Sequence, residues 1–142
     1  MKNQSEPLDP KLAGGAIILV DHGSRREQSN RLMLEAVSAY RQFSDWSIVE
    51  PAHMELAEPS MATAFGRCVR QGADWVIVFP YFLGSGRHST EDIPRLAVEA
   101  AARYPGLRYR VASPLGLHPL LLQVIDARIA DCLQSLLPPV GD

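Results

Sequence analysis

The chain is 142 residues long, which fits one domain with a buried core. Its 14 Lys and Arg residues against 16 Asp and Glu residues give a net charge of −2, which argues against binding of nucleic acid or a membrane surface through bulk charge. The longest apolar stretches are too short to cross a bilayer, and residues 1–14 lack the cationic end and apolar segment of a signal peptide. We therefore predict a cytoplasmic protein with a flexible leader and no nucleic-acid or membrane partner.

The first half of the chain alternates between strand-like and helix-like patterns. An apolar run at residues 16–20 predicts a strand, and apolar residues at helical spacing between 32 and 43 predict the helix that follows. The second apolar run, at residues 46–54, contains Pro51, which cannot donate a ladder hydrogen bond. We expect this strand to lie at a sheet edge or to be bulged there. Helical spacing returns at residues 61–69.

The stretch AEPS is typical of the beginning of this second helix. Pro59 would lie near the first turn, and Ser60 is available as a cap. We interpret Glu58 as a residue that caps the helix or stabilises its dipole. Glu55 is closer to the end of the preceding strand, so we assign the chemical role to Glu55.

The second half of the chain repeats the alternation. Residues 75–83 form the most apolar run, which is typical of a strand covered on both faces. Ser89 or Thr90 is predicted to cap the Ala-rich helix that follows. A fourth strand is predicted at residues 107–112, and it precedes a last amphipathic helix. The apolar face of that helix is marked by Leu121, Ile125, Ile129 and Cys132.

Strands and helices that alternate in this way predict an α/β fold with a central parallel sheet of four strands and right-handed crossovers. Residues 15–137 are expected to form a single domain and residues 138–142 a tail. The two cysteines, Cys68 and Cys132, form no CxxC motif and both fall in helix-like stretches, so we expect reduced core thiols.

Each of the four histidines lies at or just past the carboxyl end of a predicted strand. They are His22, His53, His88 and His118. Ligands bind at this edge of an open α/β sheet. Glu55 lies 33 residues after His22 and 33 residues before His88, about one strand–helix unit each way, so these three can converge on one rim. Two imidazoles and a carboxylate suit a divalent transition metal, although backbone hydrogen bonding explains any single histidine as well.

Small residues and arginines flank two of the histidines, in HGSRR and GSGRHS. Glycines let the backbone approach a ligand closely, and N–H groups of a loop that leads into a helix attract anions. Arg25, Arg26 and Arg87 offer forked donors that match carboxylates or phosphates. We therefore predict a locally cationic rim, although solvated surface would explain each arginine taken alone.

With these stretches in place, the sequence resembles the small class II tetrapyrrole chelatases, the sirohydrochlorin cobaltochelatase and ferrochelatase family. The matching stretches, in order between Ala16 and about Arg128, are ILVDHGSR, AHMELAEPS, VFPYFLGSGRHSTEDIP and PLGLHP. The resemblance implies a three-layer αβα, flavodoxin-like doubly wound architecture and a symmetric homodimer. It also implies insertion of Co2+ or Fe2+ into sirohydrochlorin, on the way to cobalamin or sirohaem.

The resemblance assigns metal binding and catalysis to His22, Glu55 and His88. We expect the two histidines to bind the incoming ion and relay protons, with Glu55 as a ligand or base. The ion is a substrate, with Ni2+ as a further candidate, so no prosthetic group is expected. His53 is expected to be structural.

The other expected site residues contact the macrocycle. Sirohydrochlorin carries eight carboxylates, which would explain arginines at the rim of an acidic protein. The expected substrate-binding residues are Ser24, Arg25, Arg26, Gly84, Ser85, Gly86, Arg87 and His118. An apolar wall against the ring is expected from Met54, Phe82 and Leu83.

Three other functions stay open on the sequence. The HGSRR stretch is faintly similar to the motif of histidine phosphatases, but Asp21 stands where that motif has an arginine before the histidine. A non-catalytic carrier of metal or tetrapyrrole would keep the same histidines. A chelatase for another ring or ion is the third, because imidazole and carboxylate ligands discriminate poorly among these metals.

Overall fold

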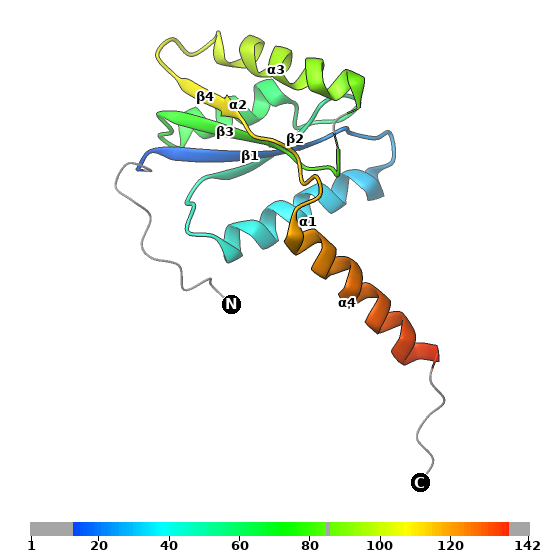
Figure 1. Cartoon of the computed structure of the whole chain (residues 1–142). Helices are drawn as coiled ribbons and strands as arrows, with labels where there is room; N and C mark the ends of the chain where they lie inside the picture. The colour runs from blue at the N-terminus through cyan, green and yellow to red at the C-terminus, as the bar shows by residue number, and fades with distance from the viewer. Residues whose placement is uncertain (1–12, 85, 137–142) are drawn as a thin grey trace.

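Four strand–helix units follow one another along the chain (Figure 1). The computed structural model describes residues 13–84 and 86–136, with residues 87–89 described in their backbone only. The elements are β1 (Gly15–Asp21), α1 (Glu27–Phe43), β2 (Val49–His53), α2 (Met61–Arg70), β3 (Trp75–Pro80), α3 (Arg87–Ala101), β4 (Arg108–Val111) and α4 (Pro119–Leu136). Most of the predicted leader, residues 1–12, and the predicted tail lie outside the described residues.

The four strands form one parallel sheet in the order β2-β1-β3-β4. The predicted α/β fold with a four-stranded parallel sheet is therefore confirmed. The chain moves from β1 to β2 on one side and then returns to β3 on the other side, so the strand order reverses between β1 and β3. Helix α1 covers one face of the sheet, whereas α2 and α3 cover the opposite face, which gives the predicted αβα layers (Figure 1). In such a sheet the crevice for a ligand opens at the reversal, outside the carboxyl ends of the strands.

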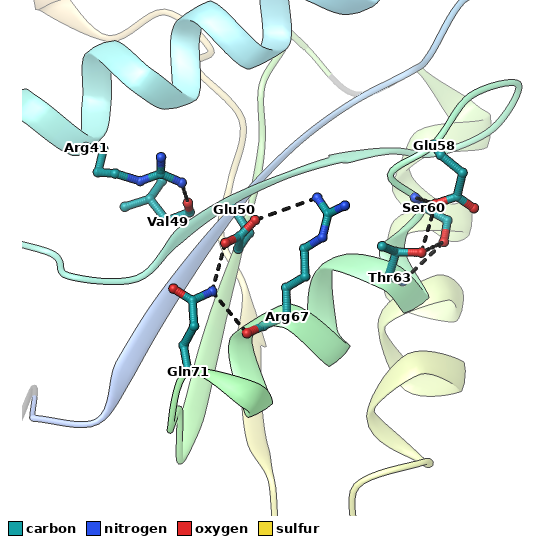
Figure 2. Close-up of polar contacts among 8 residues, drawn as sticks. All are labelled: Arg41, Val49, Glu50, Glu58, Ser60, Thr63, Arg67 and Gln71. Atoms are coloured by element: carbon teal, nitrogen blue, oxygen red, sulfur yellow. Dashed lines mark hydrogen bonds and ion pairs between the residues drawn. The ribbon is translucent and has the colours of Figure 1, made fainter.

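Strand β2 lies at one edge of the sheet, as Pro51 predicted. Pro51 pairs with Leu19 of β1. Polar contacts join this edge to the helices beside it (Figure 2). The Arg41 guanidinium donates to the Val49 carbonyl, and Gln71 Nε2 donates to Glu50 Oε1 at 2.8 Å.

Apolar side chains of the sheet point alternately into two core clusters. Ile18 and Val78 pack under α2 and α3, where Phe65 is fully buried. Ile17 and Leu19 pack against α1 on the other face. The clusters explain why β1 is apolar at every position from Ala16 to Val20, because all five of these side chains are buried under one face or the other.

Strand β3 does not have the cover on both faces that the sequence predicted. Val76 and Val78 are buried, but Ile77 and Phe79 are only half-buried on the face that α1 shares. The reason is the position of α4, which leads away from the layered domain (Figure 1).

The last helix forms as predicted, but it does not pack as an amphipathic core helix. Among the described residues, none of the α4 side chains is buried. Cys132 is therefore exposed, and the expectation of two core thiols is right only for Cys68 in α2. Burial, together with the Glu50 carboxylate, raises the pKa of the Cys68 thiol to about 12.

The predicted helix starts differ in accuracy. Ser60 caps α2, because its hydroxyl accepts a hydrogen bond from the Thr63 N–H at 3.2 Å. The prediction that Ser89 or Thr90 caps α3 is wrong, because α3 already begins at residue 87. Gly86 precedes it in an extended conformation, and Thr90 Oγ1 donates to the Gly86 carbonyl from inside the first turn. Within the described ranges, no helix is long and apolar enough to cross a membrane.

Candidate active site

His22 is exposed directly after β1, at the point where the strand order reverses. Its ring stacks on Phe82, with centroids 4.6 Å apart and planes inclined by 21°. Phe82 follows β3, and the Tyr81 N–H donates to the Val20 carbonyl at 2.7 Å, which extends the pairing of the two strands. The imidazole thus has a defined neighbour on one side, in the crevice where open α/β sheets bind ligands. Phe82, expected as an apolar wall for the macrocycle, contacts His22.

The backbones of His22 and Glu55 lie side by side. The pairing of β1 with β2 continues past the strand ends, because the Met54 N–H donates to the Asp21 carbonyl at 2.9 Å and the Glu55 N–H to the His22 carbonyl at 3.3 Å. Two of the three predicted metal ligands therefore come from adjacent, hydrogen-bonded positions. Their spacing of about one strand–helix unit arises because β1 and β2 are neighbours in the sheet.

Gly23 is required for this close approach of the two loops. It has a φ of +85°, and a Cβ at this position would lie 2.0 Å from the Glu55 carbonyl oxygen. The sequence had suggested that glycines of this loop bring the backbone close to a ligand. The structure shows that Gly23 instead brings it close to the next loop of the same chain.

His53 is the buried histidine of the site, with 1% of its surface exposed. Its Nδ1 lies 2.5 Å from Asp21 Oδ1, and the same oxygen accepts a hydrogen bond from the Gly23 N–H at 3.1 Å. Asp21 and His53 together hold the backbone on both sides of His22. The structural role expected for His53 agrees with this arrangement, whereas the positioning role of Asp21 was not predicted. An acidic residue at the end of a buried strand was the signal that could have identified it.

The two glutamates of the β2–α2 loop have different surroundings. Glu58 Oε2 accepts hydrogen bonds from the Ser60 N–H and from Thr63 Oγ1, both at 2.8 Å (Figure 2). These two bonds lower the pKa of the Glu58 carboxyl from its ordinary value. Glu58 thus stabilises the first turn of α2, as predicted, while Glu55 is exposed beside His22.

The loop from His22 to α1 is fixed by its own polar groups. Asn30 accepts from the Ser24 N–H at 2.9 Å and donates to the Ser24 carbonyl at 2.7 Å. The Ser24 hydroxyl accepts from the Arg26 N–H at 3.0 Å. Ser24, expected to bind substrate, is therefore engaged in shaping the loop, and Asn30 is a positioning residue that the sequence analysis missed.

Next to this loop lies a hollow of about 430 Å³. Arg25 and Arg31 line one side of it, and Leu56 and Ala57 of the β2–α2 loop line the other. Arg31 also pairs with Glu27 at 3.4 Å, and Arg26 is exposed. Glu27 and Glu58 line the same hollow, so its charged lining consists of two arginines and two glutamates. The cationic rim that HGSRR predicted therefore stays a prediction, and Arg31 was not foreseen.

The third predicted ligand, His88, has its backbone in the first turn of α3, directly after the loop that contains Phe82. The side chains of Arg87 and His88, and the whole of Ser85, lie outside the described residues. Among the side chains that are described, no group of three could hold a metal ion. Gly84 and Gly86 are exposed at this loop.

His118 is exposed immediately before α4, and its Nδ1 accepts a hydrogen bond from the Leu120 N–H at 3.2 Å. The segment before it runs beside the β3–α3 loop, because the Leu115 N–H donates to the Phe82 carbonyl and the Gly116 N–H to the Leu83 carbonyl. The predicted site segments after β1, β2, β3 and β4 are thus joined along one edge of the sheet. A contact of His118 with the macrocycle stays a prediction.

The comparison with known proteins agrees with this geometry. The model of the CbiX family matches residues 16–132. The chain belongs to the CbiX family. A crystal structure of a putative cobalamin biosynthesis CbiX protein from Marinobacter aquaeolei matches with a TM-score of 0.75 and 30% identity, over 85% of this chain and 98% of that one.

Two further relatives of this CbiX chain are longer than it is. The chloroplastic sirohydrochlorin ferrochelatase of Arabidopsis thaliana is 52% identical over 94% of this chain and 60% of its own length. The sirohydrochlorin chelatase SirB of Bacillus subtilis subspecies spizizenii, solved in complex with cobalt, has a TM-score of 0.71 and 33% identity, over 82% of this chain and 50% of SirB. The chain therefore spans about half to three-fifths of these two proteins.

Proposed function

We propose that this CbiX chain is a chelatase that inserts a divalent metal ion, Co2+ or Fe2+, into sirohydrochlorin. The observation that carries the proposal is the exposed His22 imidazole, set at the strand-order reversal with Glu55 hydrogen-bonded beside it. The names of the Arabidopsis and Bacillus relatives support the same substrate.

The reaction exchanges two pyrrolic protons of the macrocycle for one divalent ion. A neutral imidazole can hold the ion or accept a proton, and the carboxylate of Glu55 can do either as well. We assign ion delivery to His22 and His88, and proton acceptance to His22 and Glu55. Phe82 stacks on one face of the His22 ring and so favours one orientation of the imidazole.

The substrate carboxylates would bind at the rim. Arg25 and Arg31 face the hollow beside the β1–α1 loop, and guanidinium groups bind carboxylates through paired hydrogen bonds. In this proposal Arg87, His118, Ser85, Gly84 and Gly86 also contact the substrate. The ion is a substrate, and no prosthetic group takes part.

The test is an absorbance assay with sirohydrochlorin and Co2+, Fe2+ or Ni2+, comparing the wild type with His22→Ala, Glu55→Gln and His88→Ala. Glu35→Gln on the exposed side of α1 is the matched control for Glu55→Gln. Loss of a general base or ligand is expected to lower the rate by about 100-fold or more. The metal that gives the highest rate identifies the preferred ion.

The alternatives have their own outcomes in this assay. A wild-type rate no faster than the reaction without protein would favour the carrier over the chelatase. Equal rates for the wild type and the histidine variants would remove both histidines from the mechanism. A phosphohistidine trapped after mixing with a phosphomonoester would favour the phosphatase.

Two further expectations belong to this proposal. The homodimer is tested by light scattering on the intact chain. A cytoplasmic location is tested by imaging a tagged chain in its own cell, and this matters because the Arabidopsis relative is named as a chloroplast protein.

A further inference from the structure

His22 lies in a turn that its two neighbours close. The carboxylate of Asp21 reaches past His22, and its Oδ1 accepts a hydrogen bond from the Gly23 N–H at 3.1 Å. An aspartate that binds the backbone two residues further on stabilises a tight turn. Gly23 has a φ of +85°, which this path of the chain requires. The Asp21 carboxylate therefore helps to determine the direction in which the chain presents His22.

Glu55 lies in a second closed loop, which follows β2. The His53 N–H donates to the Pro59 carbonyl at 2.8 Å, so the chain returns to the end of β2 within one short loop. Leu56, directly after Glu55, has a φ of +69°, a left-handed conformation that is typical of tight turns. His53 thus closes the base of the loop that presents Glu55.

A single side-chain contact joins the bases of these two loops. His53 Nδ1 lies 2.5 Å from Asp21 Oδ1, the same oxygen that accepts from Gly23. The two residues are also direct partners in the pairing of β1 with β2. The His53 side chain is 1% exposed and the Asp21 side chain 23%, so water competes little for this bond. One carboxylate oxygen thus connects the turn at His22 with the loop at Glu55.

Stability alone is a poor explanation for a buried pair of this kind. Removing a carboxylate and an imidazole from water costs free energy, and apolar side chains of similar shape often serve a fold equally well. A hydrogen bond differs from an apolar contact because it fixes both a distance and a direction. Direction matters most at this place, since Asp21 directly precedes His22 and only Met54 separates His53 from Glu55.

We propose that Asp21 and His53 are positioning residues for metal insertion, which set the distance and orientation between His22 and Glu55. They act through these two side chains and bind neither the ion nor the macrocycle. The inference rests on the proposed function, in which His22 delivers the ion and both groups accept protons. Such a transfer needs the reacting groups in one geometry, and a displacement of about 1 Å can lower a rate by about 100-fold.

The effect is expected on the chemical step rather than on substrate binding. The segment that follows the turn is held separately, because Asn30 binds both the N–H and the carbonyl of Ser24. Arg25 directly follows Ser24 and lines the hollow beside it, so its expected contact with a substrate carboxylate does not depend on Asp21. Loss of the contact between Asp21 and His53 is therefore expected to lower kcat and to leave the KM for sirohydrochlorin nearly unchanged.

The first experiment measures kcat and KM for sirohydrochlorin at a temperature where circular dichroism shows every variant folded. Asp21→Ala and His53→Leu are each expected to lower kcat by about 10- to 100-fold. The double variant is expected to be no slower than either single one, because the two residues act as a unit. Asp21→Asn keeps an acceptor oxygen of the same reach and is expected to restore most of the rate. Val37→Ala, in the core under α1, is the control for lost stability without lost kcat.

The second experiment does not require activity. The His22 ring stacks on Phe82 with centroids 4.6 Å apart, so the ring current of Phe82 shifts the proton NMR signals of this imidazole. The spectrum of His22→Ala identifies those signals among the four histidines of the chain. The shift is expected to persist in Asp21→Asn and Val37→Ala. It is expected to be largely lost in Asp21→Ala and His53→Leu, because the turn that presents His22 is then no longer fixed.

Wild-type kcat in folded Asp21→Ala and His53→Leu would overturn the proposal. A Val37→Ala variant as slow as these two, or unchanged His22 signals in both of them, would also overturn it. An inactive wild type would instead contradict the proposed function, and the His22 signals would then decide whether the pair positions the ring. If Asp21→Ala does not fold, His53→Leu decides the outcome, because it retains most of the volume of the buried side chain.

Discussion

The loops after β1 and β3 resemble each other in sequence, since each joins glycine, serine and arginine to a histidine, but they are held in different ways. In the first, Asp21, His53 and Asn30 fix the backbone around His22. In the second, no described residue lies within 4 Å of the position where a Cβ would lie on Gly84 or Gly86. The first loop presents one imidazole in a set direction, whereas the glycines of the second leave space at the rim. Similar motifs thus serve different purposes.

The largest expected effect comes from Gly23→Ala. The new Cβ would meet the Glu55 carbonyl at 2.0 Å, and the φ of +85° disfavours any side chain. We expect a loss of about 3 kcal/mol or more in the free energy of unfolding, measured by urea denaturation. Gly84→Ala in the other loop is the matched control and is expected to change stability by less than about 1 kcal/mol. Equal losses for the two variants would contradict the difference between the loops.

His53→Ala is expected to have the next largest effect. It removes a fully buried ring and the partner of the Asp21 carboxylate. The expected loss is about 2–4 kcal/mol, measured by the same denaturation. His118→Ala, at an exposed position, is expected to cost about 1 kcal/mol or less, because it removes only the bond to the Leu120 N–H. If His53→Ala lowered the free energy of unfolding less than His118→Ala, the contact between His53 and Asp21 would not be what stabilises the first loop.

Leu56→Gly is expected to stabilise the chain slightly. Leu56 directly follows Glu55 and has a φ of +69°, a conformation that costs an ordinary residue roughly 1–2 kcal/mol. Glycine removes this strain but is more flexible in the unfolded chain, so we expect a net gain of up to about 1 kcal/mol in thermal unfolding. Leu83→Gly, at an equally exposed position for which no positive φ is found, is the control. If Leu56→Gly lowered the stability as much as Leu83→Gly, the backbone of Leu56 would not be strained in this loop.

The smallest expected effect is a pH-dependent one, from Glu58→Gln. The pKa of the Glu58 carboxyl is lowered in the folded chain, mainly by the Ser60 N–H and then by Thr63. Its contribution to stability is therefore present above the ordinary value of 4.5 and disappears as the pH falls through the lowered value. Because Glu58 is exposed, we expect less than about 1 kcal/mol at pH 7. Urea denaturation at pH 7 and near pH 3 checks this, and a difference from wild type that grows at low pH would contradict it.

Much of the fold could be predicted from the sequence because its signals are local. The apolar runs identified the strands. Pro51 restricted the second strand to a sheet edge or a bulge, because proline lacks the N–H that a ladder needs in any surroundings, and the edge position is the one observed. Ser60 was found as a cap for the same reason. The start of α3 was missed because Gly86 has an extended backbone that its sequence neighbourhood does not specify. The partial exposure of Ile77 and Phe79 was missed because it depends on the position of α4 relative to the sheet, which no local sequence pattern indicates.

The site divides in the same way. The convergence of His22 and Glu55 could be predicted from their positions at strand ends and from their spacing, because the ends of neighbouring parallel strands lie at the same edge of the sheet. The Asp21–His53 pair and the hydrogen bonds of Asn30 to the Ser24 backbone could not be predicted from the sequence, because they depend on side-chain directions that the packing determines. The different surroundings of the two glycines were also visible only in three dimensions, since Gly23 lies against a neighbouring carbonyl and, among the described residues, Gly84 does not.

The buried thiol of Cys68 has a practical consequence for chemical labelling of the chain. Its side chain is fully buried and burial raises its pKa to about 12, so it is expected to react with alkylating agents far more slowly than the exposed Cys132. Chemical labelling of the folded chain therefore reports on Cys132 alone. Cys132 lies one helical turn from Ile129, so the rate of its alkylation measures whether this part of α4 is exposed to solvent or buried in a contact.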